Sequence, residues 1–517
     1  MRNRRDILGL AAAAGLTPAW ARALTGPRQI HGFHPELSPG ADQLMAWVRQ
    51  LHKFGPIRPT GTPQMHAFED WLEVQFKGLG FSVERIPYRL TSWECDVKDC
   101  SISVTEDGKA ARDVEVLAYY PFCASTRGQP AATGRVLYAG VGEAAVKALV
   151  ANTDARTLAE SVVVMDMPMG LGIRADKPIR TYSKTFPDPL PPYPATPNVF
   201  SSGGRTAMEA VEGRVKALVL CYTNLSDEAG RYNYAPFSDP HRKTPALRVG
   251  KTSGDYLRSV AGKAVIALRC DAKLTPDARC DTLVATLPGP SEEVVFVTTE
   301  TDGPNEINEN GPLGVLALAT HAVKAKDRRR TLVCSLPTGH YAMGAVMDPV
   351  TGSGKPAGTR GVMQARPEIM ARTVGHLAME QMGATDWRDD GGRWRATGGP
   401  APAYWLPTAA VQARMIDLFF PCTVGEDPRF SQSLISLETF PPGEGGSTRN
   451  AGIPGWGLMG MPHYFFRADP NGVIDKFDPR IMKVQVDILT KLMVLLDRLT
   501  PDQLHGRAPV TAADLYA

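Results

Sequence analysis

Four carboxylates stand close together in the stretch "TTETDGPNEINENGPLG", residues 298–314, which follows an apolar run. They are Glu300, Asp302, Glu306 and Glu309. Carboxylates that are held this close repel one another, so they need a metal ion, a shared proton or basic partners. The alternative is a hydrated loop, because charged side chains are usually exposed. We favour the first interpretation, in which these acids face a cation, a proton or a substrate.

Three apolar runs, "VVFVTT", "TLVCSLP" and "TVGHLAME", lead to residues that can transfer protons or bind metal. The first leads to Glu300 and Asp302, the second to His340, and the third ends in Glu380. In an open α/β sheet the ligand site lies beyond the carboxyl ends of the strands. We therefore expect these four side chains at one edge of a sheet, as an acid–base or metal-binding group.

The helix after the acidic stretch is expected to begin at Glu309. Asn310 is the expected N-cap, and the helix dipole there favours a negative charge. A glycine-rich loop further on, "FPPGEGGSTRNAGIPGW", holds Glu444 and Arg449, either of which could meet a charged group of a substrate. We assign Asn305, Glu444 and Arg449 as substrate contacts. Glycine-rich loops are also common as simple turns.

The composition is that of a globular chain. Its 517 residues are 43% hydrophobic and 21% charged, which is enough for two or three domains with real cores. The formal net charge is +3. The first 22 residues hold four arginines and one aspartate, so the rest of the chain is close to neutral. This balance excludes the basic surface of a nucleic-acid-binding protein.

The N-terminus, "MRNRRDILGLAAAAGLTPAWARA", has the pattern of a twin-arginine export signal. Arg4 and Arg5 precede a short apolar stretch that ends in the small residues Ala21 and Ala23. The apolar part is too short for a membrane helix, and no later segment reads as a membrane span. An ordinary N-terminal helix is the alternative. We expect a periplasmic or secreted protein that is exported after folding or cofactor loading.

The eight cysteines are compatible with an oxidising compartment. Cys95 with Cys100, and Cys270 with Cys280, are close enough in sequence to close small loops. Neither pair has the CxxC spacing of a structural zinc site. Free thiols are as consistent with this spacing as disulfides are.

The order of predicted elements favours an α/β fold. Residues 40–80 have the apolar spacing of helices, and residues 85–140 have short strand-like runs. From residue 271 onward, strand-like runs alternate with helical stretches, and residues 481–499 form an amphipathic helix. Such alternation is typical of a mostly parallel sheet that is covered by helices on both faces.

Three segments resemble the exported zinc aminopeptidases, a family that also has carboxypeptidase-like and glutaminyl-cyclase members. "TLVATLPGPSEEVVFVTTETDGPNEINENGPLGVLALA" is similar to the family's strand, His-x-Asp, glycine-rich Asp-Asn-Gly loop and helix. "HLAMEQMGA" is similar to its later strand, which ends in an acidic metal ligand. "NAGIPGWGLMGMPHYFFRADPNGVIDKFDP" is similar to its final Gly-Ile-Pro strand and the His-containing loop before the last helix.

The resemblance implies an aminopeptidase-like α/β fold with an inserted β-rich protease-associated domain, which "ESVVVMDMP" and "TPALRVGKTSGDYL" resemble. The expected organisation is a signal peptide at 1–23 and the first part of the α/β domain at 24–114. The inserted domain is expected at 115–270, and the remainder of the α/β domain, with the active site, at 271–517.

The resemblance also implies a metal site, although the ligands differ from the family pattern. The family's first zinc-binding His corresponds to Glu300, and its metal-bridging Asp corresponds to Glu309. Asp302 and Glu380 keep the acidic character of their counterparts, and His463 is the candidate for the final His. Oxygen thus replaces most of the imidazole ligands, which suits harder ions than zinc.

The leading interpretation is an exported hydrolase of amide or ester bonds in a small-molecule or peptide-like substrate. At most one divalent ion, which would be zinc or a harder ion such as manganese or calcium, would be bound. Its expected ligands are Asp302, Glu309, Glu380 and His463. The family's catalytic Glu-Glu pair is missing, so His340 would transfer protons in its place.

Two other functions remain open from the sequence. One is a metal-independent acid–base enzyme, a lyase or isomerase of a small non-peptide molecule, with Glu300, Glu309 and His340 as its catalytic groups. The other is a binding protein that kept the fold and lost the chemistry. Fold alone cannot choose among these functions.

Overall fold

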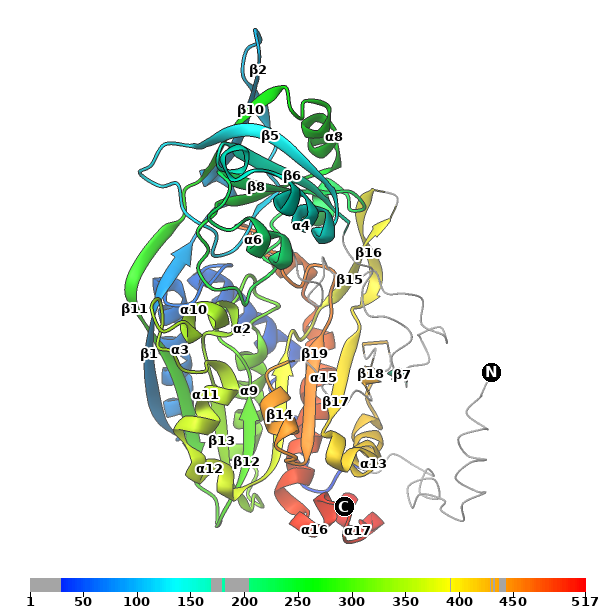
Figure 1. The fold of residues 1–517 in the computed structure, drawn as a ribbon. Coiled ribbons are helices and arrows are strands. Elements are labelled where there is room, and N and C mark those ends of the chain that lie inside the picture. The colour runs from blue at the N-terminus through cyan, green and yellow to red at the C-terminus, as the bar shows by residue number, and fades with distance from the viewer. Residues whose placement is uncertain are drawn as a thin grey trace.

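The structure, a computed structural model of the chain, describes residues 29–168, 179–181, 204–390, 392–427, 429–430, 433–436 and 443–517. The predicted signal peptide, residues 1–23, lies outside the described residues. Within them the chain forms two large sheets, one above the other in Figure 1. Among the described helices, none combines the length and the apolar character that a membrane span requires.

The first sheet has nine strands among the described residues. In spatial order they are β1 (Ser82–Glu94), β11 (Lys273–Leu287), β13 (Arg330–Leu336), β12 (Ser291–Thr298), β14 (Thr373–Glu380), β19 (Gly455–Gly460), β17 (Ala403–Pro407), β18 (Ser433–Ser436) and β7 (Ile179–Thr181). The central strands β13, β12, β14 and β19 are parallel, and mainly antiparallel pairs extend the sheet on both sides. This mixed sheet with helices on its faces confirms the predicted α/β class.

Helices cover both faces of the parallel centre. One face packs against α2 (Ala41–Phe54), α3 (Pro63–Gly78), α9 (Gly311–Lys324) and α15 (Pro479–Arg498), and the other packs against α11 (Gly358–Ala365) and α12 (Pro367–Arg372). The side chains of β12 alternate accordingly. Val295 and Val297 pack in the core formed with α2, α3, α9 and α15, whereas Val294 and Phe296 pack with Val362 of α11. A strand that is buried on both faces reads as a continuous apolar run, which is why "VVFVT" was recognisable.

The second sheet consists of eight strands among the described residues. They are β3 (Arg112–Val114), β2 (Cys100–Glu106), β10 (Ala264–Cys270), β5 (Ala132–Val141), β6 (Ser161–Met167), β8 (Ala217–Tyr222), β9 (Ala246–Val249) and β4 (Ala118–Tyr119). The sheet therefore includes residues 100–114, which the sequence analysis placed in the α/β domain. These residues belong here because β2 pairs with β10 along its length. Its relation to protease-associated domains stays a prediction.

Among the described strands, the chain crosses between the two sheets four times, because β7 lies between β6 and β8 in the chain but belongs to the first sheet. The first crossing leaves β1 and the last one enters β11, and these two strands pair along their length from Ser82↔Thr286 to Glu94↔Lys273. In Figure 1 they form the left edge of the lower sheet and rise toward the upper one. The first and last crossings are thus made through two neighbouring strands.

The remaining described elements lie around the two sheets. A hairpin is formed by β15 (Thr385–Asp390) and β16 (Arg393–Pro400). The other helices are α4 (Glu143–Asn152), α5 (Ala155–Ala159), α6 (Arg205–Val211), α7 (Asp227–Gly230), α8 (Lys251–Ser259), α10 (Met343–Met347), α13 (Gln412–Thr423), α14 (Gly446–Asn450), α16 (Pro501–Leu504) and α17 (Ala512–Leu515).

The start of α9 differs from the expectation. The helix begins at Gly311, and Asn310 stands at the N-cap position without a side-chain cap hydrogen bond. The Asn310 side chain instead pairs with the backbone of Met382: its Oδ1 accepts from the amide at 2.8 Å, and its Nδ2 donates to the carbonyl at 2.6 Å. Asn310 therefore joins α9 to the end of β14 rather than capping the helix.

Gly311→Ala should destabilise the protein, because the start of α9 packs directly on β14. A Cβ at this position would lie 1.9 Å from the Thr299 Oγ1 atom and 2.4 Å from the Met379 carbonyl oxygen. Overpacking of this kind costs about 1–3 kcal/mol. The measurement is the free energy of unfolding in urea. Gly78→Ala is the matched control, because a Cβ there meets nothing within 4 Å; an equal loss in both variants would contradict the packing argument.

Candidate active site at the carboxyl ends of the parallel strands

Side chains from three neighbouring strand ends and one loop meet at the edge of the first sheet. Glu300 follows β12, His340 follows β13, and Glu380 is the last residue of β14. Glu444 comes from the loop before α14. One ligand atom each of Glu300, His340 and Glu444 lies within 4.8 Å of the others. Glu380 joins them, because its Oε1 atom accepts a hydrogen bond from the Glu444 amide.

His340 and Glu444 form the central pair of the site. The His340 Nδ1 atom lies 2.5 Å from the Glu444 Oε1 atom. The other Glu444 oxygen accepts hydrogen bonds from the Thr359 amide at 3.1 Å and from the Thr359 hydroxyl at 2.8 Å. Phe237, from the second-sheet region, stacks on the imidazole at 5.0 Å between ring centroids.

The electrostatics of this pair favour a protonated imidazole. Burial lowers the pKa of His340, but Glu444, Glu380 and Asp302 outweigh it and raise that pKa to about 9. Burial alone would favour a neutral Glu444, yet His340 and Thr359 lower the pKa of Glu444. At neutral pH the pair is therefore an imidazolium and a carboxylate.

Glu300 differs from the other acids in having an oxygen without a partner. Its Oε1 atom accepts from Gln381 Nε2 at 3.0 Å, and the same nitrogen donates to Glu380 Oε2 at 3.1 Å. The Glu300 Oε2 atom is buried and has no hydrogen-bond partner among the described residues. Burial, followed by the charges of Glu380 and Glu444, raises the pKa of Glu300 well above its ordinary value.

Asp302 positions the loop that carries His340. Its two oxygens accept from the backbone amides of Gly339 at 3.0 Å, His340 at 3.3 Å and Tyr341 at 3.2 Å, and from the Thr60 hydroxyl. A carboxylate with four donors has little capacity left for an ion. The structure thus gives Asp302, which we predicted as a metal ligand, a positioning role.

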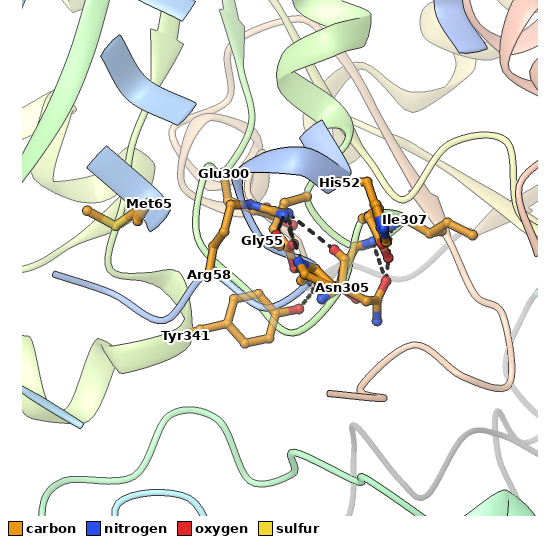
Figure 2. Close-up of polar contacts among 12 residues, drawn as sticks. His52, Gly55, Arg58, Met65, Glu300, Asn305, Ile307 and Tyr341 are labelled. Atoms are coloured by element: carbon orange, nitrogen blue, oxygen red, sulfur yellow. Dashed lines mark hydrogen bonds and ion pairs between the residues drawn. The ribbon is translucent and has the colours of Figure 1, made fainter. Parts of the chain in front are cut away.

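Glu309 is paired with a buried arginine that the sequence analysis missed. Arg58 Nη2 donates to Glu309 Oε2, and both side chains are fully buried. The Asn305 amide donates to the other Glu309 oxygen at 3.2 Å. Arg58 and Gly303 also exchange backbone hydrogen bonds at 2.9 and 3.0 Å. Figure 2 shows Arg58 beside Asn305, with the Tyr341 hydroxyl close to the same loop.

Little in the sequence marks Arg58 as a buried residue. It stands in "GPIRPTG", a Gly/Pro-rich connection between two helices, where an arginine is normally solvated. Its partner, Glu309, is 251 positions away in the chain. The tight turn and the missing helical pattern predict a loop but not a buried ion pair.

The side chain of Asn305, predicted as a substrate contact, bonds to its own loop and to the segment at 465–467. Its Oδ1 atom accepts from the amides of Ile307 at 3.0 Å and Asn308 at 2.9 Å. Its Nδ2 atom donates to the carbonyls of Phe465 at 3.2 Å and Arg467 at 3.1 Å. With these bonds and 1% exposure, the side chain of Asn305 is engaged within the protein, and its contact with a substrate stays a prediction.

Glu306, the remaining acid of the stretch, also has a structural role. It contacts His52 of α2 through Oε1 and accepts the Val473 amide through Oε2 at 2.8 Å. Of the four clustered carboxylates, three therefore have both oxygens engaged in hydrogen bonds or ion pairs within the protein. Only Glu300 among them has a buried oxygen that the described residues leave unpartnered.

Arg449, predicted as a substrate contact, is buried near the acids. It is 4% exposed, and a Cβ at Gly445 or Gly457 would come within 2.5 or 2.1 Å of its Nη1 atom. Burial lowers the pKa of Arg449 to about 10, although Glu380 and Glu444 oppose that shift. Arg449 therefore balances the charge of the carboxylates from below the glycine-rich loop.

His463 does not join this group. Its ring packs against Trp394 of β16 at 5.0 Å between centroids, and neither ring nitrogen has a hydrogen-bond partner among the described residues. Burial lowers the pKa of His463 to about 4, with opposing effects from Asp386 and Asp389 of β15. His463 thus packs beside the β15–β16 hairpin, and its ligand role stays a prediction.

The arrangement fits one metal ion but not two. The Arg58 guanidinium already neutralises Glu309, which the resemblance made the bridging ligand, and Asp302 is saturated. Glu300, His340 and Glu444 remain as a compact set of one nitrogen and two carboxylate ligands. The unpartnered Glu300 Oε2 atom is an acceptor that a cation would satisfy.

Arg58→Met should destabilise the protein strongly, because it leaves the buried Glu309 carboxylate without its partner. Removal of one member of a buried ion pair costs about 3–5 kcal/mol. Glu309→Met in the same chain should recover much of that loss, which a double-mutant cycle in urea would measure. Arg89→Met is the control, because its pair with Asp277 is exposed. A cost at Arg58 no larger than at Arg89 would contradict the buried-pair argument.

No protein-family model matches this sequence, and no curated protein matches it either. Several solved structures nevertheless share its fold. An aminopeptidase from Aneurinibacillus sp. strain AM-1 aligns with a TM-score of 0.56 at 14% identity, over 90% of this chain and 95% of that one.

Two more solved structures are similar over nearly their whole length. A peptidase precursor from Shewanella amazonensis SB2B aligns with a TM-score of 0.58 at 14% identity, over 88% of this chain and 96% of that one. BSAP, a zinc aminopeptidase from Bacillus subtilis, aligns with a TM-score of 0.57 at 14% identity, over 88% and 94%. The chain thus has an aminopeptidase-like α/β fold.

Proposed function

We propose that the protein is an exported hydrolase of amide or ester bonds in peptide-like substrates, acting at the Glu300, His340 and Glu444 site. The observation that carries the proposal is the buried Oε2 atom of Glu300. It lacks a partner among the described residues and belongs to a residue within ligand distance of His340 and Glu444. The similar folds of two aminopeptidases and a peptidase precursor support the reaction class.

One divalent ion is part of this proposal. Glu300, Glu444 and His340 would hold it, and bound there it would act as a Lewis acid toward the scissile carbonyl. Two carboxylates with one imidazole suit zinc or manganese. The charge that a second ion would supply is replaced by the guanidinium of Arg58, which lies against Glu309.

The chain's own residues position the groups of the site. The Glu444 carboxylate, fixed by two donors from Thr359, orients His340 through Nδ1, so Nε2 is the nitrogen that would hold the ion. Asp302 holds the backbone of His340 in place through its amide contacts. Gln381 bridges Glu300 and Glu380, because its Nε2 atom donates one hydrogen bond to each carboxylate.

A metal-independent acid–base enzyme is the second candidate, and one distance favours it. His340 Nδ1 and Glu444 Oε1 are 2.5 Å apart. Two ligands of one tetrahedral ion stand about 3.3 Å apart, given metal–ligand bonds of about 2.0 Å. A direct hydrogen bond between the two groups needs no ion between them, so in this alternative Glu300 would be the acid and the His340–Glu444 pair the proton reservoir.

Glu300→Gln should lower kcat by about 100-fold or more, because an amide can neither transfer the proton nor bind a cation in the same way. The measurement is hydrolysis of a panel of chromogenic aminoacyl and dipeptidyl amides and esters. Glu292→Gln, the same change at the exposed start of β12, is the matched control. Unchanged turnover in Glu300→Gln would remove this residue from the mechanism, and a wild type inactive on the whole panel would contradict the hydrolase.

Metal removal separates the two candidates. Dialysis against a chelator should abolish hydrolysis, and zinc or manganese should restore it. Elemental mass spectrometry should find one ion fewer per chain in Glu300→Gln than in Glu292→Gln. Full activity after chelation, with the same ion content in both variants, would favour the metal-independent enzyme.

A further inference from the structure

Four cysteines converge at a place far from the acids in the chain. Cys95 Sγ lies 3.6 Å from Cys100 Sγ and 3.9 Å from Cys270 Sγ, and the last two are 3.9 Å apart. Cys123 Sγ lies 3.5 Å from Cys270 Sγ. Cys270 is fully buried, and Cys100 and Cys123 are nearly so. We name these residues the four-cysteine cluster.

The spacing of three of the sulfurs matches that of a tetrahedral thiolate site. With zinc–sulfur bonds of about 2.3 Å, the edges of a tetrahedron are about 3.8 Å. The separations among Cys95, Cys100 and Cys270, from 3.6 to 3.9 Å, lie around that value, and these three sulfurs form one group within ligand distance. The Cys123 sulfur lies 3.5 Å from that of Cys270 but outside this group, so it would have to rotate toward the other two to take the fourth position. A disulfide requires its sulfurs about 2.05 Å apart. Pairing within the cluster would therefore move two sulfurs together and away from the others.

The cluster does not follow the pairs that the sequence suggested. Cys95 does lie beside Cys100, but Cys270 faces Cys100 across the β2–β10 ladder. Cys280 lies elsewhere, where its sulfur would contact a Cβ at Gly61 at 3.3 Å. The four cysteines come from three separate segments of the chain, so the sequence contains no CxxC motif that would indicate a zinc site.

The position of the cluster gives it a structural purpose. Cys95 and Cys100 flank the crossing from β1 to β2, and Cys270 ends β10 just before the return through β11. Cys123 lies in a loop of the second sheet, and its carbonyl accepts from Trp93 Nε1 of β1 at 3.0 Å. One ion there would join both crossings to that loop.

We propose that the four-cysteine cluster binds one zinc ion as a structural tetrathiolate site, which fixes the second sheet to the first. Binding deprotonates the four thiols, releases four protons and involves no oxidation. This site is independent of the proposed hydrolysis, because it shares no residue with the acid cluster. The predicted twin-arginine signal suits it, since a chain folded before export would bind zinc while its thiols are reduced.

The test compares metal content in matched variants of the mature full-length chain. Cys270→Ser should lose one zinc per chain by elemental mass spectrometry, whereas Cys422→Ser should lose none. Cys422 is equally buried but contacts only the Leu418 carbonyl among its described partners. Equal zinc in the two variants would overturn the proposal. Glu300→Gln should keep this zinc, so failure of the hydrolase proposal and failure of this one are distinguishable.

Two measurements on the wild type cover the case in which Cys270→Ser does not fold. Cobalt-substituted protein should show intense thiolate-to-cobalt charge transfer, and X-ray absorption at zinc should give four sulfur neighbours at about 2.3 Å. Alkylation in denaturant with a chelator and without reductant should modify all eight cysteines. Modification of only six or four would show disulfides and would overturn the zinc site.

Discussion

The cost of burying carboxylates governs the architecture of this protein. An ionised acid that leaves water must find donors or counter-charges, or it becomes neutral. In the 298–314 stretch, Asp302, Glu306 and Glu309 find such groups elsewhere in the chain, whereas one oxygen of Glu300 has no partner among the described residues. Arg58 comes from the α2–α3 connection, and the amides that bind Asp302 come from the β13 exit. The loop is therefore held by its charges as much as by apolar packing.

This constraint explains why glycines surround the acids. A Cβ at Gly303 would meet Glu309, one at Gly443 would meet Glu380, and one at Gly472 would meet Glu306, each within 2.7 Å. Backbone must come this close to supply amide donors to a carboxylate, and only glycine permits the approach. The glycines of these loops therefore let the backbone approach the buried carboxylates of the site.

The sequence predicted what depends on local pattern and missed what depends on distant partners. The apolar runs located β12, β13 and β14, so the meeting of Glu300, His340 and Glu380 followed from strand direction alone. Arg58 and Thr359 could not be found, because nothing near them in the chain marks their carboxylate partners. Asn310 has the residue type of a helix cap, yet its side chain hydrogen-bonds to the backbone of Met382 instead.

The second sheet reaches the site through Phe237, whose ring covers the imidazole of His340. This aromatic belongs to the segment between the adjacent antiparallel strands β1 and β11, which also contributes the edge strand β7 to the first sheet. The residues of the acid cluster all lie outside this segment in the chain. A different segment could therefore replace it, together with β7 and the cover over His340, without rethreading the acid cluster.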